Sequence, residues 1–371
     1  MTQASTTSQP DTAWLAAAIR TANVPTLACI LVQLTGDHRW IEGDYIPSRT
    51  RGLEDNDDGG LPEAIQQEIK AAALDALTAW FNGRPLAMPN PSDDLLLEMM
   101  SVTLGENIPA EYAPIIRHEL RLSPQPEGLA GPPPGFSALI IGAGISGLCA
   151  AVQFTAANIP YTIVERRDDL GGVWFDNRYP GAACDVPSHL YSFSFAPYPW
   201  SRYFAGSREI HQYLEHVADE FDIRRHIRFG VEVIEARFDE ASGTWQADVQ
   251  TKAGARETLH ANIVISGVGA FNKPRIPDVP GLDRFKGPSV HTARYPDEGL
   301  DLKGRNVVLV GNGASAMQVA PAIVDEVGSL TIVQRTRNGS PRSRSSSSRS
   351  PVRCRICCSR CRFIACGIAC G

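Results

Sequence analysis

The N-terminal third of the chain is predicted to be helical, because its apolar residues recur at helical spacing. Three segments show this spacing, namely 13–22, 62–83 and 93–104. The second begins with Pro62 and Glu63 and stops at Gly83, which are good start and stop residues for a helix. No catalytic arrangement occurs in this region. We therefore expect an all-α N-terminal domain over residues 1–122, followed by a Pro- and Gly-rich linker at 123–135.

Beyond the linker, the pattern changes to a short apolar strand, a glycine loop and a helix, and this unit occurs twice. The first unit spans 137–165 and the second spans 306–336. Between them, three segments that alternate in polarity indicate an antiparallel meander, at 231–238, 244–251 and 257–267. The predicted fold class is α/β, with two Rossmann-like dinucleotide-binding domains, a meander and the preceding all-α domain. The expected domain boundaries are 136–284 for the first nucleotide-binding domain and 285–336 for the start of the second, including the segment that connects them.

Composition changes this picture only at the C-terminal end. The chain carries a net charge of −6, yet residues 337–371 hold eight Arg and no acid, together with six of the nine Cys. The other cysteines are Cys29, Cys149 and Cys184, a low usage that fits a reducing compartment. No apolar run approaches the ~20 residues of a membrane span. The N-terminus has no signal-peptide pattern, so we expect a cytoplasmic protein without membrane contact.

The first glycine loop has the spacing of a dinucleotide-binding site. Gly142 permits a tight turn, Gly144 lets a pyrophosphate approach the backbone, and Gly147 allows the helix to pack closely on the strand. The helix N-terminus would face the phosphates. Glu165, at the end of the next strand, can accept hydrogen bonds from both ribose hydroxyls. A glycine turn without a ligand is the alternative, but the strand–loop–helix context favours a nucleotide.

The second glycine loop predicts a site for NADPH. Gly311, Gly313 and Ala316 follow a strand, and an Ala at the third position is compatible with the motif. The next strand ends in Gln334, Arg335 and Thr336, where an NAD site would carry an acid. The planar guanidinium of Arg335 suits a 2′-phosphate. A solvated charge at the end of a strand is the alternative for Arg335.

Residues 165–195 resemble the flavin-contacting loop of flavoprotein monooxygenases, and of the Baeyer–Villiger type in particular. The resemblance implies an FAD site that includes the Gly171–Trp174 step and the Tyr179-Pro180-Gly181 turn. It assigns FAD contacts to Ser146, Glu165, Val173, Trp174, Asp185 and Tyr191. Val173 stands where the family usually has Thr. Asp185 is the implied catalytic residue, beside the flavin, although an ordinary loop Asp is the alternative. Ser315 and Thr336 are implied phosphate contacts in the second site, and Cys184 is expected to serve packing.

A signature between the two loops separates subclasses of this family. Phe285, Gly287, His291 and Tyr295 match FxGxxxHxxxY, whereas the Baeyer–Villiger fingerprint ends in Trp and the related N- and S-oxygenases have Tyr or Phe. The rest of the signature and the loop around Asp185 favour the Baeyer–Villiger side. We interpret His291 as a hinge residue rather than a base. The helical N-terminal domain is similar to that of the 4-hydroxyacetophenone monooxygenase subgroup.

The resemblance, which covers residues 136–336, implies an enzyme that uses FAD, NADPH and O₂. It would insert one oxygen atom next to a ketone carbonyl and so form an ester or a lactone. The expected partners are O₂ and a small-molecule ketone, with an aryl ketone as one candidate. We expect no metal and no nucleic acid, and a homodimer through the N-terminal domain is left open. Two alternatives stay open, namely a flavin N- or S-oxygenase and a non-enzymatic pseudogene product.

The tail at 337–371 allows three interpretations. It could be an RS-type segment that binds nucleic acid, a zinc knuckle built on Cys354, Cys357, Cys358 and Cys361, or the product of a frameshift. Allowed codons for this tail, read one base back, can encode PQWIAPFPKFQQP and VPDLLLAMPLYRLWYRLR, which is ordinary amphipathic text. We therefore expect a non-native tail after about Thr336, and a truncated, inactive chain that lacks the family's active-site Arg.

The frameshift hypothesis makes a prediction about the gene. Inserting one base near codon 336 should reopen a reading frame of several hundred codons and yield a soluble, yellow protein. The 371-residue form should be poorly soluble, because a Ser- and Arg-rich tail offers little apolar area to cover the second nucleotide domain. Genomic sequencing around codons 334–340 checks this. A gene without such an open frame would contradict the hypothesis. The tail would then be interpreted as a zinc knuckle or as a segment that binds nucleic acid.

Overall fold

The computed structural model describes residues 12–48, 57–120, 122–123, 131–271, 273–278 and 280–335. Thr336 and the tail at 337–371 lie outside the described residues. The chain divides into two compact units, each of which is considered by itself. Of the described residues, the first unit comprises those up to 123 and Ser188–Tyr203, and the second comprises those from 131 to 187 and from Phe204 to 335. Within the described part of the chain, no helix is long and apolar enough to cross a membrane.

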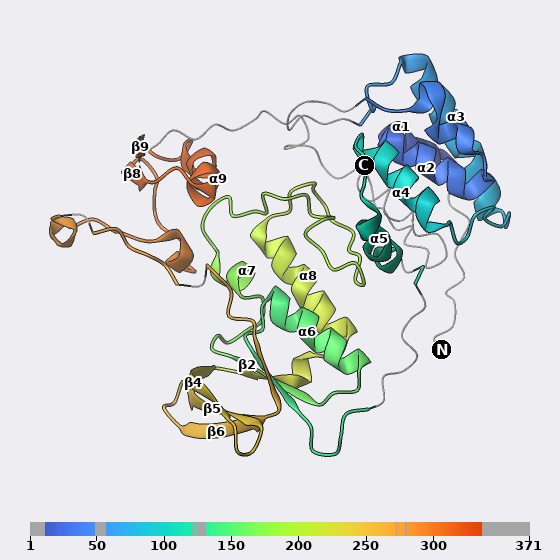
Figure 1. Cartoon of the computed structure of the whole chain (residues 1–371). Coiled ribbons are helices and arrows are strands. Elements are labelled where there is room, and N and C mark those ends of the chain that lie inside the picture. Colours follow the sequence, from blue (N-terminus) through green and yellow to red (C-terminus); the bar gives the residue numbers. More distant parts are fainter. Residues whose placement is uncertain are drawn as a thin grey trace. The chain divides into compact units, whose positions relative to one another are not determined.

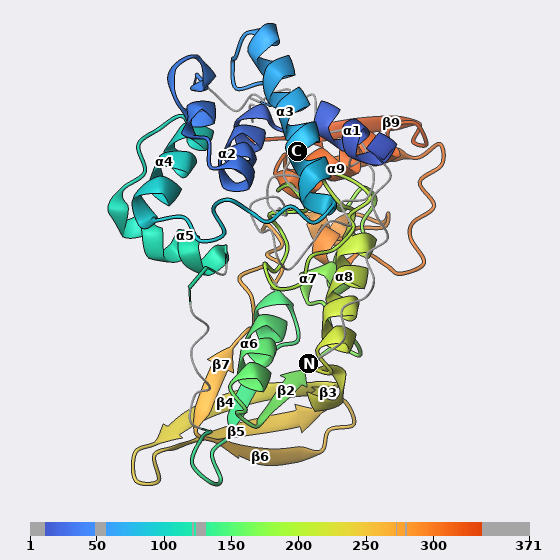
Figure 2. The ribbon, with the colours of Figure 1, turned by 90° about the vertical axis from the view of Figure 1, so that its right-hand side faces the viewer.

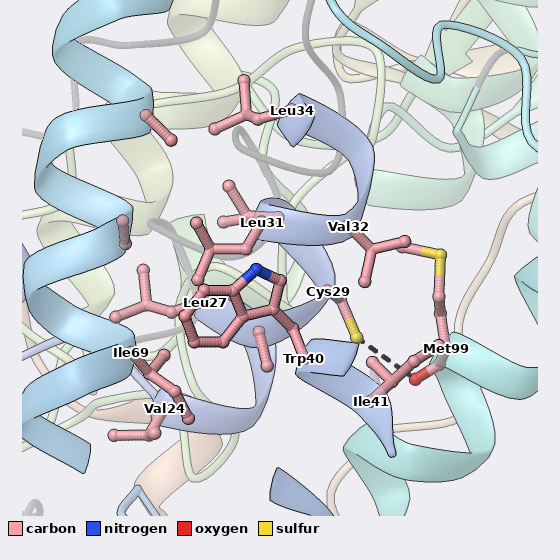
Figure 3. Close-up of a cluster of buried hydrophobic side chains, with 14 of the residues drawn as sticks. Val24, Leu27, Cys29, Leu31, Val32, Leu34, Trp40, Ile41, Ile69 and Met99 are labelled. Carbon is pink, nitrogen blue, oxygen red and sulfur yellow. Dashed lines mark hydrogen bonds between the residues drawn. The ribbon is translucent and has the colours of Figure 1, made fainter. Parts of the chain in front are cut away.

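The first unit is built around one nearly all-apolar helix. Its helices are α1 (Thr12–Arg20), α2 (Val24–Thr35), α3 (Glu63–Phe81), α4 (Asp93–Leu104) and α5 (Ala113–Glu119). Almost every residue of α2 is buried, and Leu27, Leu31 and Ile69 belong to the core between α2 and α3 (Figure 3). The predicted segments correspond to α1, α3 and α4. Helix α2 was not among them, because a helix that is apolar all round shows no polar face in its sequence.

Cys29 is a structural residue of this core. Its Sγ donates a hydrogen bond to the carbonyl oxygen of Met99 at 3.3 Å, so that α2 is joined to α4 (Figure 3). Complete burial raises the pKa of the Cys29 thiol to about 11, although a hydrogen bond with Thr103 opposes the shift. A thiol with so high a pKa is not a nucleophile at neutral pH. The helical unit therefore uses this cysteine for packing.

The second unit has three layers centred on a parallel sheet. The sheet has the order β3-β2-β1-β7, formed by Ile227–Phe229, Tyr161–Glu165, Ala138–Ile141 and Ile263–Ser266. Helix α6 (Ile145–Ala156) packs on one side of it (Figure 2). An antiparallel sheet of β4 (Val231–Asp239), β5 (Thr244–Thr251) and β6 (Arg256–Ala261) packs on the other, where Leu139 and Val164 meet Ala247 and Val249.

The prediction that residues 257–267 form one strand of the meander was wrong. The structure divides this segment at Asn262, between β6 and β7. Ala261 still pairs with Trp245 in the antiparallel sheet, whereas Ile263 pairs with Ala138 in the parallel one. The Asn262 side-chain oxygen accepts a hydrogen bond from the Ser137 backbone N–H at 2.9 Å. One continuous apolar pattern spans both strands because both sheets contribute to the same core.

Two further helices belong to the second unit, and short 3-10 turns occur in both units. Helix α7 (Val173–Asp176) is a single turn after the Gly171–Gly172 step, and α8 (Ser207–Glu220) is a long amphipathic helix that packs against α6 and α7 (Figure 1). The sequence interpretation did not identify α8. The 3-10 turns are His38–Ile41, Gly43–Tyr45, Ala110–Tyr112, Arg224–His226, Leu282–Arg284 and Thr292–Arg294.

The second strand–loop–helix unit consists of β8 (Asn306–Val310), α9 (Ala314–Ile323) and β9 (Ser329–Val333). β8 and β9 pair in parallel. One face of this pair packs with Val319 and Ile323 of α9, through Val307, Leu309 and Leu330. The other face exposes Val308, Val310 and Val333, and Ile332, on the α9 face beside Leu309, is exposed as well. Among the described residues, no further strand extends this pair.

The close packing of α6 on β1 predicts different outcomes for two glycines of the first loop. A Cβ on Gly147 would lie 1.9 Å from the backbone oxygen of Gly142, whereas a Cβ on Gly144 would meet nothing closer than 3.6 Å. Gly147→Ala should therefore destabilise the second unit by about 1–3 kcal/mol or more, because the backbone must shift. Gly144→Ala is the matched control and should unfold like the unmodified chain.

Thermal unfolding followed by circular dichroism compares the two variants. If Gly147→Ala melts at the same temperature as Gly144→Ala, the packing that we describe at this loop is wrong.

Candidate dinucleotide-binding site

A cleft of about 220 Å³ opens at the carboxyl ends of β1 and β2. The carboxyl edge of a parallel sheet is where α/β proteins place their ligands. Six of the predicted FAD residues line the cleft, namely Gly142, Gly144, Ser146, Glu165, Val173 and Trp174. Gly147 lies directly behind the loop, against Gly142. The structure thus brings together residues of the glycine loop, of the end of β2 and of the segment after Gly172.

The N-terminus of α6 forms one wall of this cleft. Gly144 is the N-cap residue, with an extended backbone conformation, and no side chain caps the helix. The first backbone N–H groups of a helix carry partial positive charge and bind anions such as phosphate. A Cβ at Gly144 would make only an ordinary contact with Gly172 at 3.6 Å. The protein's own packing therefore does not require glycine here, whereas a ligand that lies against the backbone would.

The carboxylate of Glu165 is buried and held at the opposite side of the loop. Only 6% of the residue is exposed, and its Oε2 accepts a hydrogen bond from the Ala143 N–H at 2.8 Å. Its Oε1 accepts from the Arg167 N–H at 2.9 Å. A carboxylate can accept about four hydrogen bonds, so each oxygen keeps capacity for a further donor. The arrangement fits a ligand with two adjacent hydroxyl groups.

Several residues of the cleft were absent from the sequence prediction. Arg167 and Asp176 form an ion pair at 2.9 Å and both line the cleft. Val231, Glu232 and Val233 of β4 line it as well, as do the residues at 267–269 after β7. Arg167 and Asp176 flank the Gly171–Gly172 step and could have been found by that proximity. The contribution of β4 has no local signal, because it depends on how the meander packs on the sheet.

Two of the residues implied by the resemblance do not line this cleft. Asp185 is exposed, next to Cys184, whose thiol has a pKa raised by burial. Burial and the raised pKa agree with a packing role for Cys184. Tyr191 belongs to the segment Ser188–Tyr203, which groups with the helical unit, and it is half-buried there. The roles of Asp185 and Tyr191 therefore stay predictions.

The second glycine loop is joined to the end of β9. Gly311 has a φ of +108°, which favours glycine, and its N–H donates to the Val333 oxygen at 2.8 Å. The Asn312 side chain donates to the Gln334 side-chain oxygen at 2.8 Å. These two contacts place the exposed Arg335 next to the loop. Gly313 caps α9, and Ser315 and Ala316 follow in its first turn.

The signature residues at 285–295 have separate roles in the described structure. Phe285 is largely exposed and lies against Gly287. His291 accepts a hydrogen bond from the Ala293 N–H at 3.1 Å through its Nδ1, and so caps the 3-10 turn Thr292–Arg294. Tyr295 packs against the cluster of Tyr179, Val319 and Ile323. Partial burial, with a smaller effect of Glu326, raises the pKa of Tyr295.

This chain is similar in sequence to known flavoprotein monooxygenases. The model of the flavin-binding monooxygenase-like family matches residues 137–365. An uncharacterised monooxygenase, y4iD, of Sinorhizobium fredii is 44% identical over 327 residues, which are 87% of this chain and 49% of that protein. A Baeyer–Villiger monooxygenase of Streptomyces coelicolor is 47% identical over 199 residues, which are 53% of this chain and 37% of that protein.

A solved structure gives the same picture. A steroid monooxygenase in its oxidised state, bound to NADP, is 40% identical with a TM-score of 0.51, over 55% of this chain and 40% of that chain. The chain spans about half or less of the length of these relatives. The family match extends into the Arg- and Cys-rich tail. Because the family model covers well over half of the residues, this chain belongs to the flavin-binding monooxygenase-like family.

Proposed function

We propose that this protein is an FAD- and NADPH-dependent monooxygenase of the Baeyer–Villiger type. It would transfer one oxygen atom from O₂ to a position next to a ketone carbonyl. The observation that carries this proposal is the cleft at the end of β1 and β2, where a helix N-terminus and the Glu165 carboxylate face one space. A second glycine loop beside Arg335 in the same chain supports a second nucleotide. The similarity to the Baeyer–Villiger monooxygenase of Streptomyces coelicolor supports the reaction class.

The residues of the cleft fit FAD by their chemistry. Gly144, Ser146 and the N-terminus of α6 would bind the pyrophosphate, and Glu165 would accept hydrogen bonds from the ribose hydroxyls. Val173 and Trp174 would cover the dinucleotide and exclude water. FAD, when bound, supplies the electron transfer and the activation of O₂. The chain contributes binding, orientation and shielding from solvent.

The second loop would bind NADPH in the same manner. Gly311, Gly313, Ser315 and Ala316 surround the N-terminus of α9, where a pyrophosphate is favoured. Arg335 would bind the 2′-phosphate, and Thr336, which lies outside the described residues, is proposed as a further contact. Asp185 is the proposed catalytic residue, by the family resemblance, and Tyr191 a proposed flavin contact.

The helical unit supports a finer assignment to the 4-hydroxyacetophenone monooxygenase subgroup. The similarity to y4iD covers 87% of this chain, so it includes part of the region before residue 137. We propose that the two proteins share this helical extension, that the substrate is a ketone, with an aryl ketone as the first candidate, and that dimerisation occurs through the helical unit.

A second candidate function rests on Tyr295. This residue stands at the signature position that holds Trp in the Baeyer–Villiger fingerprint, and it packs beside Tyr179 and α9. A flavin N- or S-oxygenase is the corresponding alternative. In the protein with the reopened reading frame, aryl ketones should stimulate NADPH oxidation and yield esters. Stimulation by amines or thioethers alone would favour the alternative.

Binding of FAD tests the cleft in the protein with the reopened reading frame. Titration followed by the quenching of FAD fluorescence should show one site per chain. Gly144→Ala should weaken the affinity by roughly tenfold or more, because its methyl group occupies the path of the pyrophosphate. The same variant is expected to unfold normally, so any loss of affinity cannot be ascribed to misfolding. Unchanged FAD affinity in Gly144→Ala would refute the assignment.

Cofactor preference should depend on Arg335. Its replacement by Ala removes charge-assisted hydrogen bonds worth about 1.5–3 kcal/mol when well formed. Because Arg335 is exposed, we expect the lower end of this range, roughly a tenfold rise in the Kd for NADP⁺. The Kd for NAD⁺ should not change. Arg305→Ala, at the opposite end of the β8–β9 pair, is the matched control for loss of one positive charge. Equal effects of Arg335→Ala on both nucleotides would rule out the assignment.

A further inference from the structure

The turn that follows the FAD cleft is fastened to the helix of the second glycine loop. The Tyr179 hydroxyl donates a hydrogen bond to the side-chain oxygen of Gln318 at 2.8 Å. The Gln318 side-chain nitrogen in turn donates to the backbone oxygen of Ala183 at 2.8 Å. One side chain on α9 therefore contacts the turn at two points, on both sides of Gly181.

Gly181 allows α9 to approach this closely. Its φ is +77°, and a Cβ there would lie 2.4 Å from the backbone oxygen of Gln318 and 3.0 Å from the Cβ of Ala322. Tyr179, of which 7% is exposed, packs in one cluster with Val319. Backbone lies against backbone here, with a buried aromatic ring beside the contact. We call Tyr179, Gly181, Ala183 and Gln318 the Tyr179 joint.

The signature segment reaches the same place. Arg178, the residue before Tyr179, forms an ion pair with Asp297 at 2.9 Å. Tyr295 packs against the cluster that contains Tyr179. The segment between the two glycine loops therefore contacts the turn as well as α9. A displacement of α9 cannot leave the turn unchanged, because packed interfaces shift between discrete arrangements rather than deform freely.

Each half of the Tyr179 joint is close in sequence to one of the two sites. Val173, Trp174 and Asp176, which precede the turn, line the FAD cleft. Gln318 lies one helical turn after Ser315, in the middle of α9, whose N-terminus follows the second glycine loop. A ligand that orders the first turn of α9 would thereby restrict the turn at 178–185. No residue of the second glycine loop lines the cleft, so a link between the cleft and that loop must pass through such contacts.

We propose that Tyr179 and Gln318 are positioning residues that couple the pyridine-nucleotide site to the flavin cleft. Occupation of the second glycine loop orders the turn at 178–185, and with it the cleft wall at Val173–Asp176. By linkage, occupation of the FAD cleft favours nucleotide binding at α9 by the same factor. This inference rests on the proposed function, since it requires that the second loop binds NADP⁺.

Hydrogen–deuterium exchange of the protein with the reopened reading frame, with and without NADP⁺, tests the coupling. In the unmodified chain, NADP⁺ should slow exchange at the start of α9 and also in the segment 178–185. Tyr179→Phe removes one hydrogen bond and keeps the buried ring, and Gln318→Leu removes both. In each variant we expect the protection of α9 to persist, while the protection of 178–185 falls by roughly tenfold, the factor that one buried hydrogen bond supplies.

Ser329→Ala is the matched control. It deletes one hydrogen bond, to Asn306, at the end of the β8–β9 pair that lies away from the second glycine loop. It should leave both effects of NADP⁺ unchanged. The double variant Tyr179→Phe/Gln318→Leu should behave like Gln318→Leu alone, since both substitutions remove the same hydrogen bond. Additive losses would contradict the proposed joint.

The outcomes separate this inference from the proposed function. If NADP⁺ protects 178–185 equally in the variants and in the unmodified chain, the coupling through Tyr179 and Gln318 is wrong, and the nucleotide site is intact. If NADP⁺ protects α9 but never 178–185, the inference fails in the same way. If NADP⁺ does not protect α9 at all, the proposed NADPH site is overturned, and the inference with it.

Discussion

The second unit depends on the close approach of three backbone segments at Gly142, Gly147 and Gly267. A Cβ on Gly142 would lie 2.7 Å from the Gly267 oxygen, and a Cβ on Gly147 would lie 1.9 Å from the Gly142 oxygen. The absence of side chains lets the end of β1 contact both the end of β7 and the start of α6. This contact directs the N-terminus of α6 to the carboxyl edge of the sheet. The helix wall of the cleft follows from that placement.

Backbone N–H groups hold the Glu165 carboxylate in place in the cleft. A buried carboxylate would be costly without partners, and two backbone N–H groups satisfy it here. One of these donors, Ala143, lies in the glycine loop itself, so the carboxylate and the helix N-terminus are held in a fixed relation. A site that is ordered before the ligand arrives loses less entropy on binding. The cleft is thus suited to an extended ligand with phosphate and diol groups.

The turn at 179–183 gives a second role to a segment that resembles a cofactor-binding loop. The resemblance implied that Tyr179, Pro180 and Gly181 lie along the flavin. In the structure, Tyr179 and Gly181 contact α9 of the second glycine loop, and neither lines the cleft. The turn therefore packs on α9 in the structure. Substitution of Gly181 would be strained, because this residue combines a positive φ with a close contact to the α9 backbone.

Local patterns were sufficient where the constraint itself is local. The spacing of Gly142, Gly144 and Gly147 predicted the strand, loop and helix, and the acid at Glu165 marked the end of the next strand. Helices α1, α3 and α4 followed from apolar spacing and from start and stop residues. The interpretation missed α8, although its buried residues Ile210, Leu214 and Val217 do follow helical spacing.

The sequence by itself determined that this chain carries two nucleotide-type loops, because each loop is specified by glycines within a few residues. Only the tertiary structure decided which distant residues join them. Three features join segments that are far apart in sequence. They are the two-sheet pairing on either side of Asn262, the cleft wall formed by β4, and the Tyr179 joint. No local pattern encodes such contacts, since the apolar pattern of a strand is the same in either sheet. They arise from the packing of one layer on another, which the chain reaches only when it is folded.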